Sequence, residues 1–277
     1  RYRKEMHGSM DDQLIREFAE KLEYLRGLDK RRDEIRSLID AQEKLTDEIN
    51  LALDKAATLS ELEDIYRPYR PKRKTRASIA KEKGLDPLAN DILKQEKGFD
   101  PSKSAVDYID EEKGVTSVED AIQGAMDIIA ELVSDNAEIR KRIRNLTNAN
   151  GVLVSVATDE EKDSVYKNYY DYKEPVKKIA GHRVLAVNRG EKEGFLKVSV
   201  ETDSEKPLNS IFRAMITDKN QLCSDIIREA CTDAYQRLIY PSIEREVRND
   251  LTDTASENAM KVFAVNLKQL LMQPPVK

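Results

Sequence analysis

Residues 11–40 read DDQLIREFAEKLEYLRGLDKRRDEIRSLID, and this stretch decides the fold class. Its apolar side chains recur at intervals of three and four residues, the spacing of a helix that packs along one seam. The positions between them are largely charged, so we expect the opposite face to be solvated. The pattern predicts a helical hairpin or bundle and not a globular α/β core. The seam positions are Leu14, Phe18, Leu25, Leu28, Ile35 and Ile39.

The end of the chain carries the same helical pattern over a greater length. Apolar residues recur at helical spacing over residues 222–238 and again over 243–270, with Pro241 between the two runs. Proline removes a backbone donor, so Pro241 should kink or split the helix. Residues 243–272 alone would extend about 45 Å at 1.5 Å per residue, which is longer than a small domain is wide. We expect a spine onto which other parts dock.

The middle of the chain predicts a small unit of helices and strands. The pattern Thr116-x-x-Glu119 is a capping box that opens one helix, and a second helix covers residues 136–150. The apolar run 152–156 and the alternating run 195–200 predict paired strands, with a further helix over 175–188 between them. Two helices joined by a few residues, followed by a strand, resemble a helix-turn-helix unit.

These patterns together predict a mainly α protein. We expect an elongated multi-helix scaffold with a helix-turn-helix-like unit, a small two-stranded β element and a long C-terminal helix. Three segments are expected: a helical N-terminal region over 1–115, the helix-turn-helix-like unit with its β-hairpin over 116–205, and the long helix over 206–277, kinked near residue 241.

Positive charge is concentrated in one place. The chain has 47 Lys+Arg against 52 Asp+Glu, a net charge of -5, which argues against coating nucleic acid by bulk attraction. Residues 66–76, YRPYRPKRKTR, nevertheless hold six cations and no acid, so the rest of the chain carries -5 minus 6, or -11. We call residues 66–76 the basic segment. Its two prolines predict an extended loop.

The basic segment is the best candidate binding site in the sequence. Its cations can neutralise phosphates and its tyrosines can stack on bases, which predicts weak, sequence-independent nucleic-acid binding. If all six cations met duplex phosphates, the slope of log affinity against log salt would be roughly -5 at most. The alternative is that these cations pair with the acidic helices just upstream. The candidate residues are Tyr66, Arg67, Tyr69, Arg70, Lys72, Arg73, Lys74 and Arg76.

A second aromatic cluster lies at residues 166–172, YKNYYDY. Stacking on single-stranded nucleic acid is one interpretation. We favour the other, in which the tyrosines form a strap that packs this segment onto neighbouring helices.

Motifs for catalysis are missing from the sequence. It contains no G-x-x-x-x-G-K-[ST], G-x-G-x-x-G or G-x-S-x-G pattern, so we expect no enzyme and no cofactor. With only His7 and His182 in the chain, no zinc site is expected. Cys223 and Cys231 lie eight apart in a helical pattern and cannot bridge each other, which favours a reducing, cytoplasmic location. The chain opens on Arg1 and not on Met, which suggests a segment of something longer.

The stretch LEDIYRPYRPKRKTR at 62–76, with Ile79-Ala80 and GLDPLA at 84–89, resembles the bacterial Tex family of transcription accessory proteins. Further motifs support the resemblance, which covers nearly the whole chain. They are RYRKE at 1–5, YYDYKEP at 169–175, His182-Arg183, RGEKEG at 189–194 and AVNL at 264–267.

The resemblance implies a helical N-terminal region with a helix-turn-helix-like unit and a long central helix. In complete members this region precedes an RNase H-like domain, helix-hairpin-helix elements and an OB-fold RNA-binding domain. The family is similar to a eukaryotic elongation factor that accompanies RNA polymerase and chaperones histones. We therefore expect a non-catalytic scaffold that contacts nucleic acid, either DNA or RNA, and no membrane. The alternative is a protein-interaction module that docks RNA polymerase, other transcription machinery or the remaining domains of the same protein.

Overall fold

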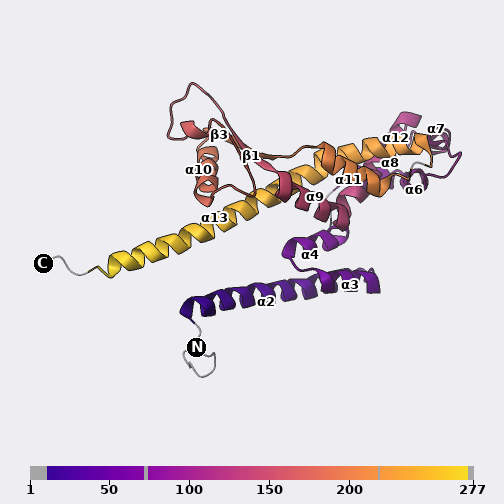
Figure 1. Cartoon of the computed structure of the whole chain (residues 1–277). Helices are drawn as coiled ribbons and strands as arrows, with labels where there is room; N and C mark the ends of the chain where they lie inside the picture. The colour runs from indigo at the N-terminus through magenta and orange to yellow at the C-terminus, as the bar shows by residue number, and fades with distance from the viewer. Residues whose placement is uncertain (1–10, 72–73, 218, 274–277) are drawn as a thin grey trace. The chain divides into compact units, whose positions relative to one another are not determined.

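The computed structural model describes residues 11–71, 74–217 and 219–273 (Figure 1). Contacts within the chain divide it into two units, and the division falls inside the basic segment. Unit 1 comprises Arg1–Arg73 and Asp135–Ala137, and unit 2 comprises Lys74–Ser134 and Glu138–Lys277. The predicted mainly α fold with a long C-terminal helix is confirmed.

Unit 1 is built on the helix that the opening stretch predicts. The second half of its seam packs as expected, because Leu28, Ile35 and Ile39 are buried against Leu53 and Leu62. The first half, at Leu14, Phe18 and Leu25, is exposed. The elements are α2 (Asp12–Asp40), α3 (Asp47–Lys55), α4 (Leu59–Tyr66) and a 3₁₀ turn, Arg67–Tyr69.

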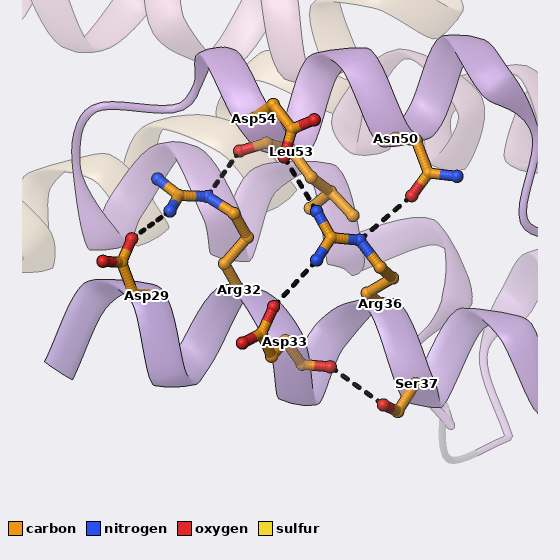
Figure 2. A network of polar contacts seen from close by, with 8 residues as sticks. All are labelled: Asp29, Arg32, Asp33, Arg36, Ser37, Asn50, Leu53 and Asp54. Carbon is orange, nitrogen blue, oxygen red and sulfur yellow. Dashed lines mark hydrogen bonds and ion pairs between the residues drawn. The ribbon is translucent and has the colours of Figure 1, made fainter. Parts of the chain in front are cut away.

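Arginines on α2 hold α3 in place (Figure 2). Arg32 donates from Nε to the Leu53 carbonyl at 2.9 Å and from Nη2 to the Ala56 carbonyl at 3.0 Å. These carbonyls lie at the C-terminal end of α3, where helix carbonyls lack intrahelical partners and a cation is favoured. Arg36 adds an ion pair to Asp54 at 2.8 Å. The sequence predicts a solvated face around Arg32, whereas this side chain is half-buried and structural.

Unit 2 contains the larger core. Buried residues of α6, α8 and α12, among them Ile92, Ile129 and Ile227, pack together with Val247. The helices of this unit are α5 (Arg76–Glu82), α6 (Asp86–Lys94), α7 (Pro101–Ala105), α8 (Val118–Asp135), α9 (Ala137–Asn150), α10 (Gly181–Lys192), α11 (Glu205–Met215), α12 (Gln221–Asp233) and α13 (Tyr240–Leu271), of which α8 and α9 contribute Asp135 and Ala137 to unit 1.

The helix α8 starts one residue later than the predicted capping box implies. The side chain of Ser117, and not of Thr116, accepts the Asp120 amide hydrogen at 3.1 Å. The Asp120 carboxylate in turn accepts the Thr116 amide hydrogen at 3.1 Å. Ser117 and Asp120 thus make the two side-chain-to-backbone hydrogen bonds expected of Thr116 and Glu119, because serine and aspartate can fill the same roles as threonine and glutamate.

The β element has three strands, where the sequence predicts two. The expected pair is present, because β1 (Val152–Ala157) and β3 (Leu196–Glu201) run antiparallel with Leu153 opposite Val200. The third strand, β2 (Asp171–Pro175), pairs with the other side of β1 and has no apolar alternation to reveal it. The helix predicted over 175–188 is shorter than expected, because β2 takes Pro175 and a turn follows at residues 176–178, so that α10 begins only at Gly181.

Side chains of α13 cover the open edge of β3. Tyr240 donates its hydroxyl hydrogen to the Val200 carbonyl at 2.8 Å, and Glu244 accepts the Val200 amide hydrogen at 3.1 Å. Arg248 donates to the Val198 carbonyl at 2.9 Å. Unpaired strand edges promote unwanted pairing with other chains, so these three contacts both protect the edge and fix the sheet on α13.

The interruption expected near Pro241 takes the form of a π-helical turn. Residues Ala234–Ile239 are π-helical and join α12 to α13 without a break, and the two helices follow one line in Figure 1. The Tyr240 amide donates to the Tyr235 carbonyl, five residues earlier. Proline cannot donate to the carbonyl four residues before it and clashes with that group. The wider π turn accommodates Pro241 inside a continuous run.

Candidate functional site

Tyr66 of the basic segment faces inward, whereas Arg70 stays exposed while it makes contacts within unit 1. The Tyr66 side chain is only 6% exposed, and the guanidinium groups of Arg31 and Arg70 lie 5.8 and 5.7 Å from its ring centroid. Arg70 also pairs with Glu63, which accepts a hydrogen bond from Arg31 at 2.7 Å. The Tyr66 ring therefore stacks within unit 1, and the base-stacking role that the sequence suggests for it has no accessible face.

Arg67 and Tyr69 are also held in place. The Arg67 guanidinium pairs with Asp135 at 3.2 Å, and the Tyr69 carbonyl accepts a hydrogen bond from Gln42 at 2.9 Å. The Tyr69 ring is half-buried against the core of unit 1. The expected extended loop is thus a 3₁₀ turn at residues 67–69, whose cations are partly engaged with acids, as the alternative interpretation predicts for Arg70.

The remaining cations of the basic segment belong to unit 2 or lie outside the described residues. Lys72 and Arg73 are among the residues that the structure does not describe. Lys74 and Arg76 are exposed, and Lys74 has only a loose ion pair with Glu82 at 3.4 Å. Arg76 begins α5. Burial raises the pKa of the Asp127 carboxyl, and the positive charge of Arg76 partly opposes this rise.

Two of the four cations of α9, Arg140 and Arg144, pair inside unit 2, whereas Lys141 and Arg142 are exposed. Arg140 is 1% exposed and pairs with Glu246 at 2.8 Å, and Arg144 reaches the same carboxylate at 2.8 Å. Arg140 also donates to the Ser242 hydroxyl at 3.1 Å. Only one residue, Asn136, separates α8 from α9, whereas a helix-turn-helix turn spans three or four residues. Arg140 and Arg144 therefore fasten α9 to α13.

The tyrosine cluster forms the strap that we favoured. Tyr166 is buried against Phe195 with 5.8 Å between ring centroids, and Tyr169 meets Tyr172 edge-on at 5.3 Å. The Tyr170 hydroxyl hydrogen-bonds to Ser164 at 2.9 Å. The cluster packs the segment before β2 onto α10 and β3, and it does not present a row of stacking faces.

Motifs that carry the family resemblance hold unit 2 together. Arg183 donates to the Glu174 carboxylate at 3.0 Å, and Tyr172 bonds to the same carboxylate. The hydrogen bond from Tyr172, followed by the pairing with Arg183, holds the pKa of Glu174 below its usual range. A Cβ at Gly190 would lie 2.5 Å from the Leu196 side chain, so only glycine allows α10 to approach β3 this closely.

The most open feature of the molecule is the end of α13. Every residue from 256 to 273 is exposed, including Phe263 at 60% and Leu270 at 62%. We call residues 256–273 the α13 tail. Its apolar side chains were visible in the sequence as helical positions, but only the structure reveals that no described residue buries them. The large apolar residues are Met260, Val262, Phe263, Val265, Leu267, Leu270, Leu271 and Met272.

The described part of the chain has neither a metal-ligand cluster nor a helix suited to crossing a membrane. Among residues 11–71, 74–217 and 219–273, no three His, Cys, Asp or Glu side chains gather as metal ligands. No helix in the same ranges has both the length and the apolar character that a bilayer span requires. Cys223 and Cys231 are free and buried.

Comparison with known proteins agrees with these motifs. Residues 96–263 match the Tex central region-like family and residues 1–40 match the Tex-like protein N-terminal domain. The uncharacterised protein YdcI of Bacillus subtilis is 44% identical over 100% of this chain and 39% of its own length. The transcriptional accessory protein Tex of Neisseria gonorrhoeae is 35% identical over 99% of this chain and 37% of its own length.

A more distant relative is the human S1 RNA-binding domain-containing protein 1, which is 29% identical over 100% of this chain and 29% of its own length. The chain thus spans well under half the length of these relatives. The match to the central region alone covers more than half of the 277 residues. The chain belongs to the Tex family.

Proposed function

We propose that this chain is a non-catalytic scaffold of a Tex-family protein, and that its α13 tail is a docking surface for the rest of that protein. The observation that carries the proposal is the run of large apolar side chains exposed from residue 256 to residue 273. Exposed apolar patches of this kind mark interaction surfaces. The relatives supply an occupant, since more than half of their length lies outside the region matched by this chain.

The arrangement of the tail suggests that it is enclosed on more than one side. At 100° per residue, one apolar stripe contains Val262, Val265 and Met272. A second stripe lies on the opposite side of the helix, with Met260, Phe263, Leu267, Leu270 and Leu271. A helix that is apolar on opposite faces is typical of the interior of a larger protein.

Between the two stripes runs a narrow polar strip. Glu257, Lys261 and Lys268 fall within roughly 40° of one another on the helix. This strip identifies the side of the tail that would stay in contact with water. It also supplies a matched control for the apolar stripes, since its residues share the same helix and the same exposure.

The docking proposal can be tested by comparing this chain with the full-length protein that contains it. Phe263→Glu with Leu267→Glu should leave the Tm of the chain unchanged, because both side chains are already exposed. The same pair should lower the Tm of the full-length protein by several degrees, because burying unpaired carboxylates is unfavourable. Lys261→Glu with Lys268→Glu, on the polar strip, is the control. Equal Tm values for all full-length variants would contradict the docking role.

A second function, sequence-independent nucleic-acid contact, is favoured by the exposed cations Arg70, Lys74 and Arg76. Two relatives are named for transcription and for an RNA-binding domain, and these names support the proposal. Association with RNA polymerase or other transcription machinery in the cytoplasm is part of this proposal.

Nucleic-acid contact is tested by fluorescence anisotropy of labelled single-stranded RNA and duplex DNA with the full-length protein. Lys74→Glu with Arg76→Glu should weaken binding and reduce the magnitude of the salt slope by roughly 1.4 to 1.8, because each of the two lost phosphate contacts contributes about 0.7 to 0.9. Lys81→Glu, on the exposed face of α5, is the control. Affinity and salt slope that do not change in the double variant would remove these residues from the interface.

A further inference from the structure

A cavity of about 220 Å³ opens beside α13, at the point where this helix ceases to be buried. Its walls come from four parts of unit 2: the end of α9, the segment after β2, the start of α10 and α13. Ala255, the last buried residue of α13, forms part of the wall. The apolar lining residues are Val176, Ile179, Val184, Val247, Leu251 and Ala255.

The size and lining of the cavity suit one large apolar side chain. An engineered protein cavity of about 150 Å³ is enough to bind benzene, so a volume of about 220 Å³ accommodates an aromatic ring or a long aliphatic side chain. Gly181 lines the cavity without a side chain, and a Cβ at this position would lie 3.2 Å from Ala255. The cavity is open to the surface at Thr254 and Asn258.

Charge at the rim distinguishes this cavity from a purely apolar one. Asp250 lines it and is exposed, and partial burial together with the carboxylates of Glu246 and Asp253 raises the pKa of Asp250. Arg144 opposes this effect, but its guanidinium is already paired with Glu246 at 2.8 Å. Because Glu246 is itself paired with Arg140 and Arg144, Asp250 is the acid of the lining that a cation at the rim would meet.

The cavity is continuous with the α13 tail. Asn258, at the cavity mouth, lies on the same helical face as Leu251, Val262 and Val265, all within roughly 60° of one another. Any element that covers this stripe of the tail therefore reaches the cavity at its end. Interfaces commonly place an anchoring side chain in such a pocket, surrounded by contacts that exclude water.

We propose that this cavity is the socket for a large apolar side chain with a basic neighbour, supplied by the part of the full-length protein that docks on the α13 tail. This inference rests on the docking function proposed above and adds the chemistry of the docked element. The apolar side chain fills the volume between Val184 and Leu251, and its basic neighbour pairs with Asp250.

The socket is tested first in this chain with benzamidine, which combines a flat apolar ring with a cationic group. Methyl NMR signals of Val184, Val247 and Leu251 should shift on titration, with benzamide binding more weakly and benzoate more weakly still. Asp250→Asn should weaken benzamidine about fivefold and leave benzamide unchanged. Glu257→Gln, which changes an exposed acid of the same helix outside the lining, is the control. Thr254→Phe should block the mouth and abolish the shifts.

Two results in this chain would overturn the socket. One is the absence of methyl shifts for all three probes, and the other is benzoate binding as tightly as benzamidine. In the full-length protein the socket should already be filled, so benzamidine should cause no shift at these methyl groups. A benzamidine affinity equal to that of the chain alone would show that the rest of the protein leaves the socket empty, and would overturn the assigned occupant.

Amide hydrogen exchange of the α13 tail distinguishes a failure of the socket inference from a failure of the docking function on which it rests. A tail that is protected in the full-length protein while the socket still binds benzamidine would overturn the inference and leave docking intact. A tail that exchanges freely while the socket is closed would contradict docking and still support a protein-derived occupant for the socket.

Discussion

Arg140 of α9 and Glu246 of α13 form an ion pair at 2.8 Å although 106 positions separate them in the sequence. The Arg140 side chain is almost completely buried, and the same carboxylate also accepts a hydrogen bond from Arg144 at 2.9 Å. Two of the four cations of α9, Arg140 and Arg144, thus hold α9 against α13, whereas Lys141 and Arg142 are exposed. This pairing identifies α13 as the element around which unit 2 is organised.

Removing Glu246 should destabilise unit 2 strongly. Glu246→Leu leaves the Arg140 charge buried without its partner, which should lower the free energy of unfolding by about 3 kcal/mol or more. Urea denaturation followed by circular dichroism measures the loss. Glu257→Leu, at an exposed position of the same helix, should change stability by less than about 0.5 kcal/mol. Similar values for the two variants would contradict a structural role for the Arg140–Glu246 pair.

In unit 1, Arg32 should control the local stability of α3. Arg32→Met keeps an apolar stem but loses the donors to the Leu53 and Ala56 carbonyls, which should cost about 1.5 to 3 kcal/mol. Hydrogen exchange of the α3 amides should accelerate accordingly. Lys30→Met, an exposed change on the same helix, should leave these rates unaltered. If both variants exchange alike, Arg32 does not support α3.

Tyr66 should behave as a core residue and not as a binding residue. Tyr66→Ala removes a ring that is 6% exposed and should lower the free energy of unfolding by about 3 kcal/mol. Tyr66→Phe preserves the ring that Arg31 and Arg70 contact and should stay within about 1 kcal/mol of the original chain. A large loss of nucleic-acid affinity in Tyr66→Phe, with stability unchanged, would restore the binding role suggested by the sequence.

The sequence predicts elements well where a single helix determines its own pattern. The second half of the α2 seam and the length of α13 both follow from local spacing. The strands β1 and β3 were also predicted, since both carry β-branched residues in alternation. The strand β2 was missed because its polar sequence forms a strand only through pairing with β1.

The partners of individual charged side chains could not be predicted in the same way. Arg32, Arg140 and the exposed Arg76 are all arginines on helices, and sequence spacing gives no means of telling which of them meets a distant acid or carbonyl. The same holds for Tyr66, whose burial depends on α2. The clustered positive charge of the basic segment therefore predicted a binding surface, but some of its cations form ion pairs within the chain.

The buried thiol of Cys231 should make stability fall at alkaline pH. Burial raises its pKa to about 12, whereas an unfolded thiol titrates near pH 9. Above about pH 9 the unfolded chain releases this proton and the folded chain does not, so the stabilising contribution is complete below pH 9 and is lost as the pH rises toward 12. Cys231→Ala should show a shallower decline in urea midpoint between about pH 9 and 11. Equal slopes would contradict the raised pKa.

The central claim is that the α13 tail is a docking surface for the rest of a Tex-family protein. The most direct measurement is amide hydrogen exchange of residues 256–273 by mass spectrometry, in this chain and in the full-length protein under the same conditions. We predict fast exchange in the chain alone, where the tail is exposed, and strong protection in the full-length protein, where the apolar stripes are covered. Exchange that is equally fast in both proteins would contradict the claim.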